Sequence, residues 1–203
     1  MSKCLSDSHQ NYLSHYLSLS LSLSLSLSLT HTLNDRMEGA IVVSVATIHE
    51  KEDLYQLINA AYDVELGSEG VSFKNSRRLL DSDELVIAFQ EQRILKASSA
   101  DGEILGCILY EIYEEQHALY FGPFAVKASA AGKGVGKELI KAIEEIAKVK
   151  VLPYFLIRVV NHRTDILPMY LKWGFVIIGE EPYPLPERLT RHSFFFILRK
   201  ELV

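Results

Sequence analysis

The stretch from Glu103 to Tyr113 is apolar on both of its alternating faces. The apolar residues are Ile104, Ile108 and Ile112 on one face and Leu105, Cys107 and Leu109 on the other. Because successive side chains of a strand point to opposite faces of a sheet, a strand with this pattern is buried on both sides. We therefore expect helices to cover both faces of the sheet that contains it.

Predicted strands and helices alternate along residues 41–203. Asp101-Gly102 is a strong tight-turn signal between two strands, and Asp81 with Glu84 is typical of a capping box that begins a helix. From β-branched runs and helical spacing, strands are expected at 41–47, 94–99, 103–113, 117–126, 154–160, 175–178 and 194–198, and helices at 49–62, 81–89, 137–150 and 164–173. This order predicts a single mixed α/β domain.

Residues 1–36 form a different kind of sequence, with a strict Leu-Ser alternation from Leu17 to Leu29. Such low complexity provides no distinct core positions. A membrane span needs about 20 predominantly apolar residues, and a secretory signal needs an unbroken apolar stretch, so the alternation fits neither. A CT dinucleotide repeat read in frame encodes the same pattern. We expect residues 1–36 to be a disordered passenger extension rather than a targeting signal, and the folded domain to span residues 37–203.

Composition and charge limit the classes of function. The chain is 48% hydrophobic and 23% charged, which is typical of a globular protein. Its formal net charge of −5 differs from the basic surplus of nucleic-acid binders, so we expect no nucleic-acid partner, and an acidic body suits a cationic partner such as an amine. Cys4 and Cys107 provide no disulfide framework, which fits a reducing compartment. The sequence therefore predicts a cytoplasmic protein without a membrane partner.

Three glycines, Gly132, Gly134 and Gly136, lie between a predicted strand and a predicted helix. Without Cβ atoms the backbone can approach a ligand closely, and the helix that follows adds N–H donors and the positive end of its dipole. Lys133 and Lys137 add positive charge. The stretch is suited to a phosphate or pyrophosphate, and a tight connection without a ligand is the alternative.

The glycine spacing excludes two familiar phosphate loops and fits a third. The nucleotide P-loop needs Ser or Thr where Glu138 stands, and the dinucleotide fingerprint needs Gly-x-Gly-x-x-Gly. The run from Ala131 to Gly136 instead resembles the Gln/Arg-x-x-Gly-x-Gly/Ala signature of the GNAT superfamily of acyl-CoA-dependent N-acetyltransferases, and Tyr170 to Phe175 is similar to a second motif of that family. The resemblance covers residues 41–203. It implies a mixed, mostly antiparallel central sheet of about seven strands, flanked by helices on both faces.

The resemblance also implies an activity and a set of site residues. We expect an N-acetyltransferase that transfers an acetyl group directly from acetyl-CoA to a primary amine of a small molecule. Tyr170 matches the family's general acid, which protonates the departing thiolate, and a strand N–H within Phe124–Val126 stabilises the developing oxyanion. The residues expected to bind CoA are Phe124, Ala125, Val126, Ala131, Gly132, Lys133, Gly134, Val135, Gly136, Lys137, Asn161 and Arg163.

Four positions depart from the family pattern, one of them Ala128, where a proline is common. Ala131 occupies the Gln/Arg position, and Arg163 stands where Asn is frequent, with Asn161 two residues earlier. Tyr120 occupies the position at which some members carry a catalytic Glu, so the resemblance supplies no general base. Two alternatives stay open: an acyl-CoA-binding module without turnover, and an enzyme that acts on protein amino groups.

The remaining residues with chemical potential are expected to be structural. Glu111, Glu114 and His117 fit exposed strand ends, and Cys107 fits a small core residue. The histidines show no ligand spacing, so we expect no metal. The segment from Glu180 to Pro186 is expected to be a loop between the last two strands, which either walls the acceptor site or acts as a rigid connector. The oligomeric state is left open, a homodimer included.

Overall fold

The computed structural model describes residues 40–63, 78–189 and 192–202. The predicted Leu-Ser extension and Cys4 lie outside the described residues. Within them, seven strands form one sheet in the order β1-β2-β3-β4-β5-β7-β6. The strands are β1 (Val42–Val45), β2 (Ile94–Ser98), β3 (Ile104–Tyr113), β4 (Ala118–Val126), β5 (Tyr154–Val160), β6 (Val176–Pro182) and β7 (Phe194–Glu201). All neighbouring pairs are antiparallel except β4 and β5, which are parallel.

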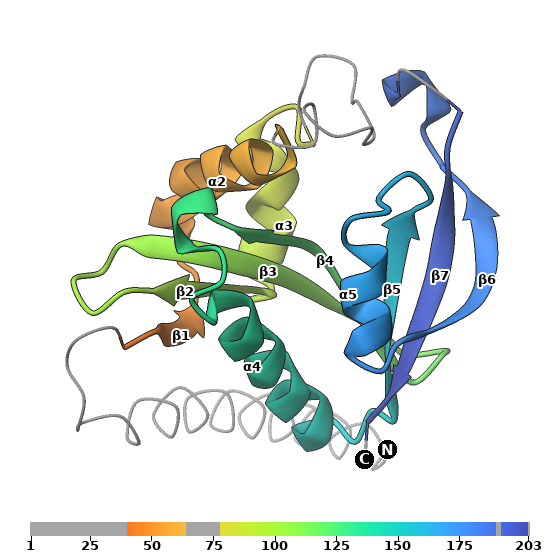
Figure 1. Cartoon of the computed structure of the whole chain (residues 1–203). Helices are drawn as coiled ribbons and strands as arrows, with labels where there is room; N and C mark the ends of the chain where they lie inside the picture. The colour runs from red at the N-terminus through yellow and green to blue at the C-terminus, as the bar shows by residue number, and fades with distance from the viewer. Residues whose placement is uncertain (1–39, 64–77, 190–191, 203) are drawn as a thin grey trace, which may run out of the picture. The chain divides into compact units, whose positions relative to one another are not determined.

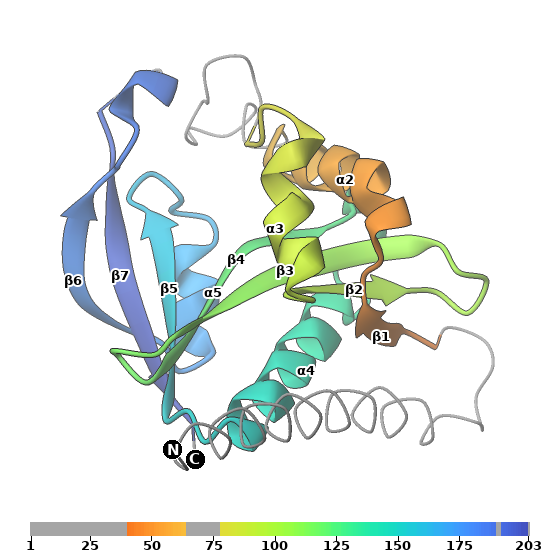
Figure 2. The same ribbon diagram turned by 180° about the vertical axis from the view of Figure 1, so that it is seen from behind.

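Helices cover both faces of this sheet, as the apolar pattern of β3 predicts (Figures 1 and 2). The α-helices are α2 (Lys51–Asp63), α3 (Val86–Gln90), α4 (Val135–Val149) and α5 (Leu167–Lys172). The 3-10 turns are η1 (Ile48–Glu50), η4 (Ser82–Leu85), η5 (Ala128–Ala130) and η6 (Pro186–Arg188). The predicted fold class is confirmed. No helix among the described residues has both the length and the apolar character that a bilayer span requires.

Two hydrophobic cores lie on opposite faces of the sheet. Cys107 of β3 packs with α2 and α3, whereas Ile108, the next residue, packs with α4 and α5. Both side chains are fully buried. Burial raises the pKa of the Cys107 thiol to about 12, because the thiolate would lose its hydration. Cys107 is therefore the core residue that the sequence predicts.

The central strands β4 and β5 separate part-way along their length. They pair only from Ala118 to Tyr120 on β4, whereas β5 pairs with β7 from end to end. The register between β3 and β4 shifts at Gly122-Pro123, where two residues of β4 oppose one residue of β3. A bulge of this kind bends a strand away from regular pairing. The result is an opening in the sheet between β4 and β5.

Some predicted boundaries are wrong. The predicted loop from Glu180 to Pro186 begins too early, because Glu180, Glu181 and Pro182 belong to β6 and pair with β7. Pro182 lacks an N–H group, but β6 is an edge strand and can accommodate it. The helix expected from Thr164 begins at Leu167. Pro168 has no N–H for the carbonyl of Thr164, so it fits only the first turn of that helix.

Candidate active site

A cavity of about 90 Å³ lies where β4 and β5 separate. Its walls come from three strands (β4, β5 and β7), from α2 and α5, and from the segments around Arg78, Ile166 and Tyr183. The lining includes four phenols, those of Tyr62, Tyr120, Tyr170 and Tyr183, and two guanidinium groups, those of Arg78 and Arg158. No carboxylate is present among the described residues that line it. We call this cavity the central cleft.

The central cleft has one wall on each face of the sheet. Ile157 and Val159 of β5 belong to the core on the α4 side. Because side chains alternate along a strand, Arg158 between them points to the opposite face. Its neighbour on that face, Val160, packs with Tyr62 of α2 and with Tyr183. The cleft therefore connects the α4 side of the sheet with the α2 side.

Tyr170 forms the wall on the α4 side. Its ring lies among Phe121, Trp173 and Phe175, with centroids 6.4, 5.8 and 5.6 Å away. Gly174 ends α5 at a φ of +89°, which allows the Phe175 N–H to turn back and donate to the Tyr170 carbonyl at 3.1 Å. Burial raises the pKa of Tyr170, because the phenolate would lose its hydration. The phenol therefore stays protonated at neutral pH and can donate a proton.

The edge of β4 that faces β5 carries backbone donors. The Lys127 N–H donates to the Leu105 carbonyl of β3 at 2.8 Å. Successive residues of a strand direct their N–H groups to opposite edges, so those of Phe124 and Val126 point toward β5. At these positions β5 has already separated from β4. These N–H groups are suited to hydrogen-bond a ligand that lies along β4.

The predicted glycine loop leads directly into α4. Gly132 and Gly134 have φ values of +76° and +88°, which other residues adopt only with strain. The first intrahelical bond is donated by the Glu138 N–H to the Gly134 carbonyl at 3.1 Å. The N–H groups of the three preceding residues, from Val135 to Lys137, therefore have no intrahelical acceptor. This helix end is suited to an anion, since the dipole adds positive charge there.

Two of the N–H groups in the predicted glycine loop already donate hydrogen bonds within the loop. The Ala131 and Lys133 N–H groups donate to the carbonyls of Ala128 and Ala130, at 3.2 and 3.3 Å. The side chains of Lys133 and Lys137 are exposed. The loop thus provides charge from its lysines and N–H donors from its second half.

Asn161 and Arg163 are held by other parts of the protein. The Asn161 N–H donates to the Phe194 carbonyl at 2.9 Å, and its Oδ1 accepts from the Phe194 N–H at 3.1 Å. Arg163 forms a two-nitrogen ion pair with Asp165, at 2.8 and 2.9 Å. Hydrogen bonding to Arg163 lowers the pKa of the Asp165 carboxyl. These contacts give both residues a structural role at the end of β5, whereas their predicted role in CoA binding stays a prediction.

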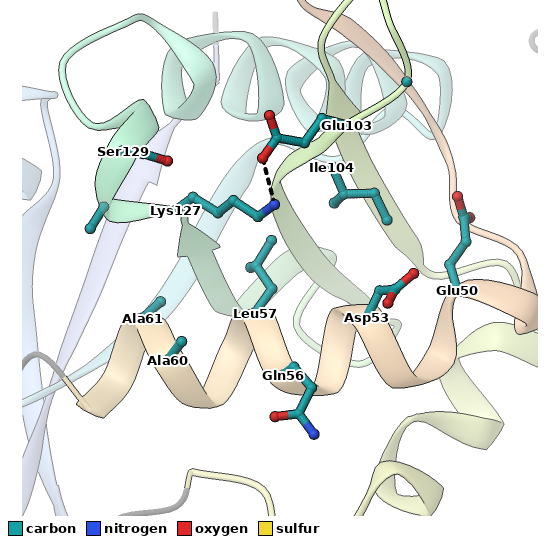
Figure 3. A pocket seen from close by; sticks show the side chains of 12 residues that line it. Glu50, Asp53, Gln56, Leu57, Ala60, Ala61, Glu103, Ile104, Lys127 and Ser129 are labelled. Atoms are coloured by element: carbon teal, nitrogen blue, oxygen red, sulfur yellow. Dashed lines mark hydrogen bonds and ion pairs between the residues drawn. The ribbon is translucent and has the colours of Figure 1, made fainter.

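A larger cavity of about 830 Å³ lies between α2 and the ends of β3 and β4 (Figure 3). Glu50, Asp53 and Glu103 contribute carboxylates to it. Its lysine, Lys127, is paired with Glu103 at 2.8 Å. This surplus of negative charge disfavours the phosphates of CoA, so size alone does not identify the cofactor site. The glycine loop and the central cleft have the better chemistry for it.

Sequence analysis missed Arg158, which the structure places in the central cleft. The available signal is a single cation within the otherwise apolar or aromatic run from Tyr154 to Val160. The sequence also predicts that Glu111, Glu114 and His117 are exposed polar residues at strand ends. The structure confirms that all three are exposed.

Residues 51–175 match the family model described as the acetyltransferase (GNAT) family. The chain belongs to this family. GNAT membership makes the protein an acyltransferase that uses acetyl-CoA, as the resemblance implies. The glycine loop, the start of α4 and the edge of β4 fit CoA, because they offer N–H donors and positive charge along one continuous path. No curated protein sequence matches the chain.

Solved structures support the GNAT fold. PaiA N-acetyltransferase from Thermoplasma acidophilum, solved with coenzyme A, superposes with a TM-score of 0.65 at 18% identity, over 80% of this chain and 99% of that chain. The ribosomal-protein-S18-alanine N-acetyltransferase from Escherichia coli superposes with a TM-score of 0.61 at 11% identity, over 80% of this chain and 94% of that chain. Nourseothricin acetyltransferase superposes with a TM-score of 0.51 at 17% identity, over 54% of this chain and 65% of that chain. At these identities the likeness concerns the fold, and the protein spans about two thirds of the last relative.

Proposed function

We propose that this GNAT protein transfers the acetyl group of acetyl-CoA to a primary amine of a small molecule, with Tyr170 as the general acid. The observation that carries the proposal is the position of Tyr170. It lines the cleft between β4 and β5, on the face of the sheet where α4 begins after the glycine loop. A protonated phenol and a helix end suited to a phosphate therefore lie on the same side of the opening.

Residues on this path have distinct roles. The N–H groups from Val135 to Lys137 and the two lysine side chains would hold the diphosphate of CoA. The N–H groups of Phe124 and Val126 would hold the arm along β4 and stabilise negative charge on the carbonyl oxygen. Gly136 allows α4 to approach β4 closely, since a Cβ atom there would lie 3.0 Å from the ring of Phe124.

Acetyl-CoA supplies the acetyl group as a thioester, whose carbonyl carbon is open to attack by an amine because the CoA thiolate is a good leaving group. As the C–N bond forms and the C–S bond breaks, the Tyr170 hydroxyl donates its proton to the departing sulfur. The proton that the amine loses passes to solvent, and solvent returns a proton to the Tyr170 phenolate. Tyr120 is unsuited to accept the proton of the amine, because burial raises the pKa of this phenol and so keeps its hydroxyl protonated at neutral pH.

The dimensions of the central cleft support a small acceptor. Its volume of about 90 Å³ is far below the roughly 300–1,000 Å³ typical of sites for drug-sized ligands. An acceptor with a short chain between its amine and its next polar group would fit such a cleft.

The proposal is tested by incubating the purified protein with acetyl-CoA and a panel of small primary amines, while free thiol and acetylated product are followed. We expect thiol release that depends on the amine and equals the amount of N-acetyl product. Tight binding of CoA without amine-dependent thiol release across the panel would contradict the proposal and indicate a binding module. Transfer to peptide amino groups alone would indicate a protein acetyltransferase.

A further inference from the structure

The charge of the central cleft is opposite to that of the whole chain. The formal net charge of the protein is −5, yet among its described residues the cleft is lined by Arg78 and Arg158 and by no Asp or Glu. The described residues of this lining therefore offer a bare alkylammonium acceptor no carboxylate to pair with. Because Arg158 is already paired with Glu181, it is the guanidinium lining itself, rather than an uncompensated charge, that favours a ligand with an anionic group.

Arg158 is held in a fixed orientation. Its Nε donates to the Glu181 carboxylate, and its Nη1 donates to the Tyr113 hydroxyl at 3.0 Å. Its Cζ lies 5.1 Å from the centroid of the Tyr120 ring, which is stacked on Tyr113. Stacking and two hydrogen bonds orient a guanidinium before any ligand arrives, which lowers the entropy lost on binding.

One nitrogen of this guanidinium remains available. In the described part of the chain, the hydrogen bonds that Arg158 donates to Glu181 and Tyr113 use Nε and Nη1, which leaves Nη2 to a ligand or to the neighbouring Tyr120 hydroxyl. The side chain is 30% exposed, so this nitrogen is not sealed in the core. Arg78 contributes a second cation, which lies 5.9 Å from the centroid of the Tyr62 ring. Two guanidinium groups in one cleft are typical of sites for carboxylates and phosphates.

The position of Arg158 is on the acceptor side of the sheet. It lies two residues beyond Leu156, the last β5 residue that pairs with β4. It points to the α2 face, whereas Tyr170 and the start of α4 lie on the other. If CoA enters along α4, the acceptor must approach the thioester from the face that carries Arg158.

Phenols surround the same position. Tyr62, Tyr120 and Tyr183 line the cleft on the α2 side, and each phenol can donate a hydrogen bond to an anion. Burial raises the pKa of Tyr120, which keeps its hydroxyl protonated at neutral pH. The α2 side of the cleft thus presents donors and positive charge together.

We infer that the acceptor is a small amine that carries a carboxylate or phosphate close to its amino group, and that Arg158, assisted by Arg78, binds this anion. The inference rests on the proposed function and names its substrate class. It predicts amino-acid-like acceptors in preference to simple alkylamines, polyamines or peptides.

Matched acceptors test the inference. Phenylalanine is compared with phenethylamine, valine with isobutylamine, and phosphoethanolamine with ethanolamine, so that the first two pairs test a carboxylate and the third a phosphate. Each anionic member is expected to have a kcat/KM about 10–100-fold higher, the ratio that a charge-assisted hydrogen bond provides. Phenylalaninamide is the control for amine basicity. Its amine loses a proton more readily than that of phenylalanine, so a preference for phenylalanine must come from the carboxylate.

Variants then identify the residue. Arg158→Gln should raise the KM of the preferred anionic acceptor about 10-fold or more. The ratio of kcat/KM between that acceptor and its neutral partner should fall to about threefold or less. The KM for phenethylamine should change little. Arg199→Gln is the matched control, because Arg199 lies on β7 outside the central cleft. Titration calorimetry of phenylalanine into the CoA-saturated protein should show the same loss of affinity in Arg158→Gln and none in Arg199→Gln.

The outcomes separate this inference from the proposed function. Acetylation of amines with no advantage for the anionic members would overturn the inference and leave the proposed function in place. Equal effects of Arg158→Gln on charged and neutral acceptors would also overturn it, since the arginine would then act on the fold. If no amine in any pair is acetylated, the proposed function fails and the inference fails with it.

Discussion

Gly136, at the start of α4, packs closely against Phe124 of β4, the strand that lines the central cleft. A Cβ atom at Gly136 would lie 3.0 Å from Cζ of Phe124. This close approach places the helix N-terminus and the free edge of β4 on one path. It gives a physical reason for the third glycine of the loop, whose φ lies outside the left-handed region.

Gly136→Ala tests this packing. The added methyl group must displace the Phe124 ring, and overpacking of this kind typically costs about 1–3 kcal/mol. We expect the Kd for CoA, measured by titration calorimetry, to rise about 5-fold or more. Gly179→Ala is the matched control, because a Cβ atom there meets nothing within 4 Å. Combining Gly136→Ala with Phe124→Leu should recover part of the affinity. An unchanged Kd in the single variant would show that the close approach is not needed for CoA.

Tyr170→Phe removes the proposed proton donor and keeps the ring that packs on Phe121 and Phe175. General acid catalysis contributes about 100-fold or more, so kcat should fall by that factor while the Kd for CoA stays the same. Tyr110→Phe is the control, since its hydroxyl donates to the Gln92 carbonyl outside the cleft. Turnover of Tyr170→Phe equal to that of the control would remove Tyr170 from the mechanism.

Cys107 predicts a pH dependence of stability. Burial raises the pKa of its thiol from 9.0 to about 12 in the folded protein. The unfolded chain loses this proton first as the pH rises, so the stabilisation is complete below pH 9 and is lost progressively between pH 9 and 12. The full loss is on the order of 4 kcal/mol.

Cys107→Ala should lower the stability slightly at pH 8 and flatten its decline toward pH 11, as measured by urea unfolding at each pH. The comparison with the parent chain isolates this thiol from the lysines and tyrosines that also titrate there. Parallel pH profiles for the two chains would contradict the assignment.

Asn161 is expected to hold the fold rather than the cofactor. Its backbone and side chain bond both polar groups of Phe194, which ties the end of β5 to the start of β7. Asn161→Ala should reduce the free energy of unfolding by about 1–2 kcal/mol and leave the Kd for CoA within about threefold. A large loss of CoA affinity at unchanged stability would instead support the role that the family resemblance implies.

The sequence could predict the elements whose signals are local. The boundaries of β5 agree with the prediction at both ends, because a run of apolar and aromatic residues is bounded by Pro153 and the turn after Val160. The two-sided burial of β3 also follows from its own pattern. The glycine loop could be located because its three glycines lie close together in the sequence, between a predicted strand and a predicted helix.

Other features depend on pairing between distant residues. Arg158 contacts Tyr113 and Glu181, which lie on strands far from it in the sequence. No local pattern states that these side chains meet or that β4 and β5 part beside them. The extension of β6 through Pro182 likewise follows from its edge position in the sheet, which depends on the whole topology.

The most direct test is a titration of the isotopically labelled protein with CoA, followed by NMR of the backbone amides. Our account predicts that the largest shifts occur at Gly132 to Lys137 and at Phe124 and Val126. Shifts confined to Glu50, Asp53 and Glu103 around the larger cavity, or the absence of any change at the start of α4, would contradict it.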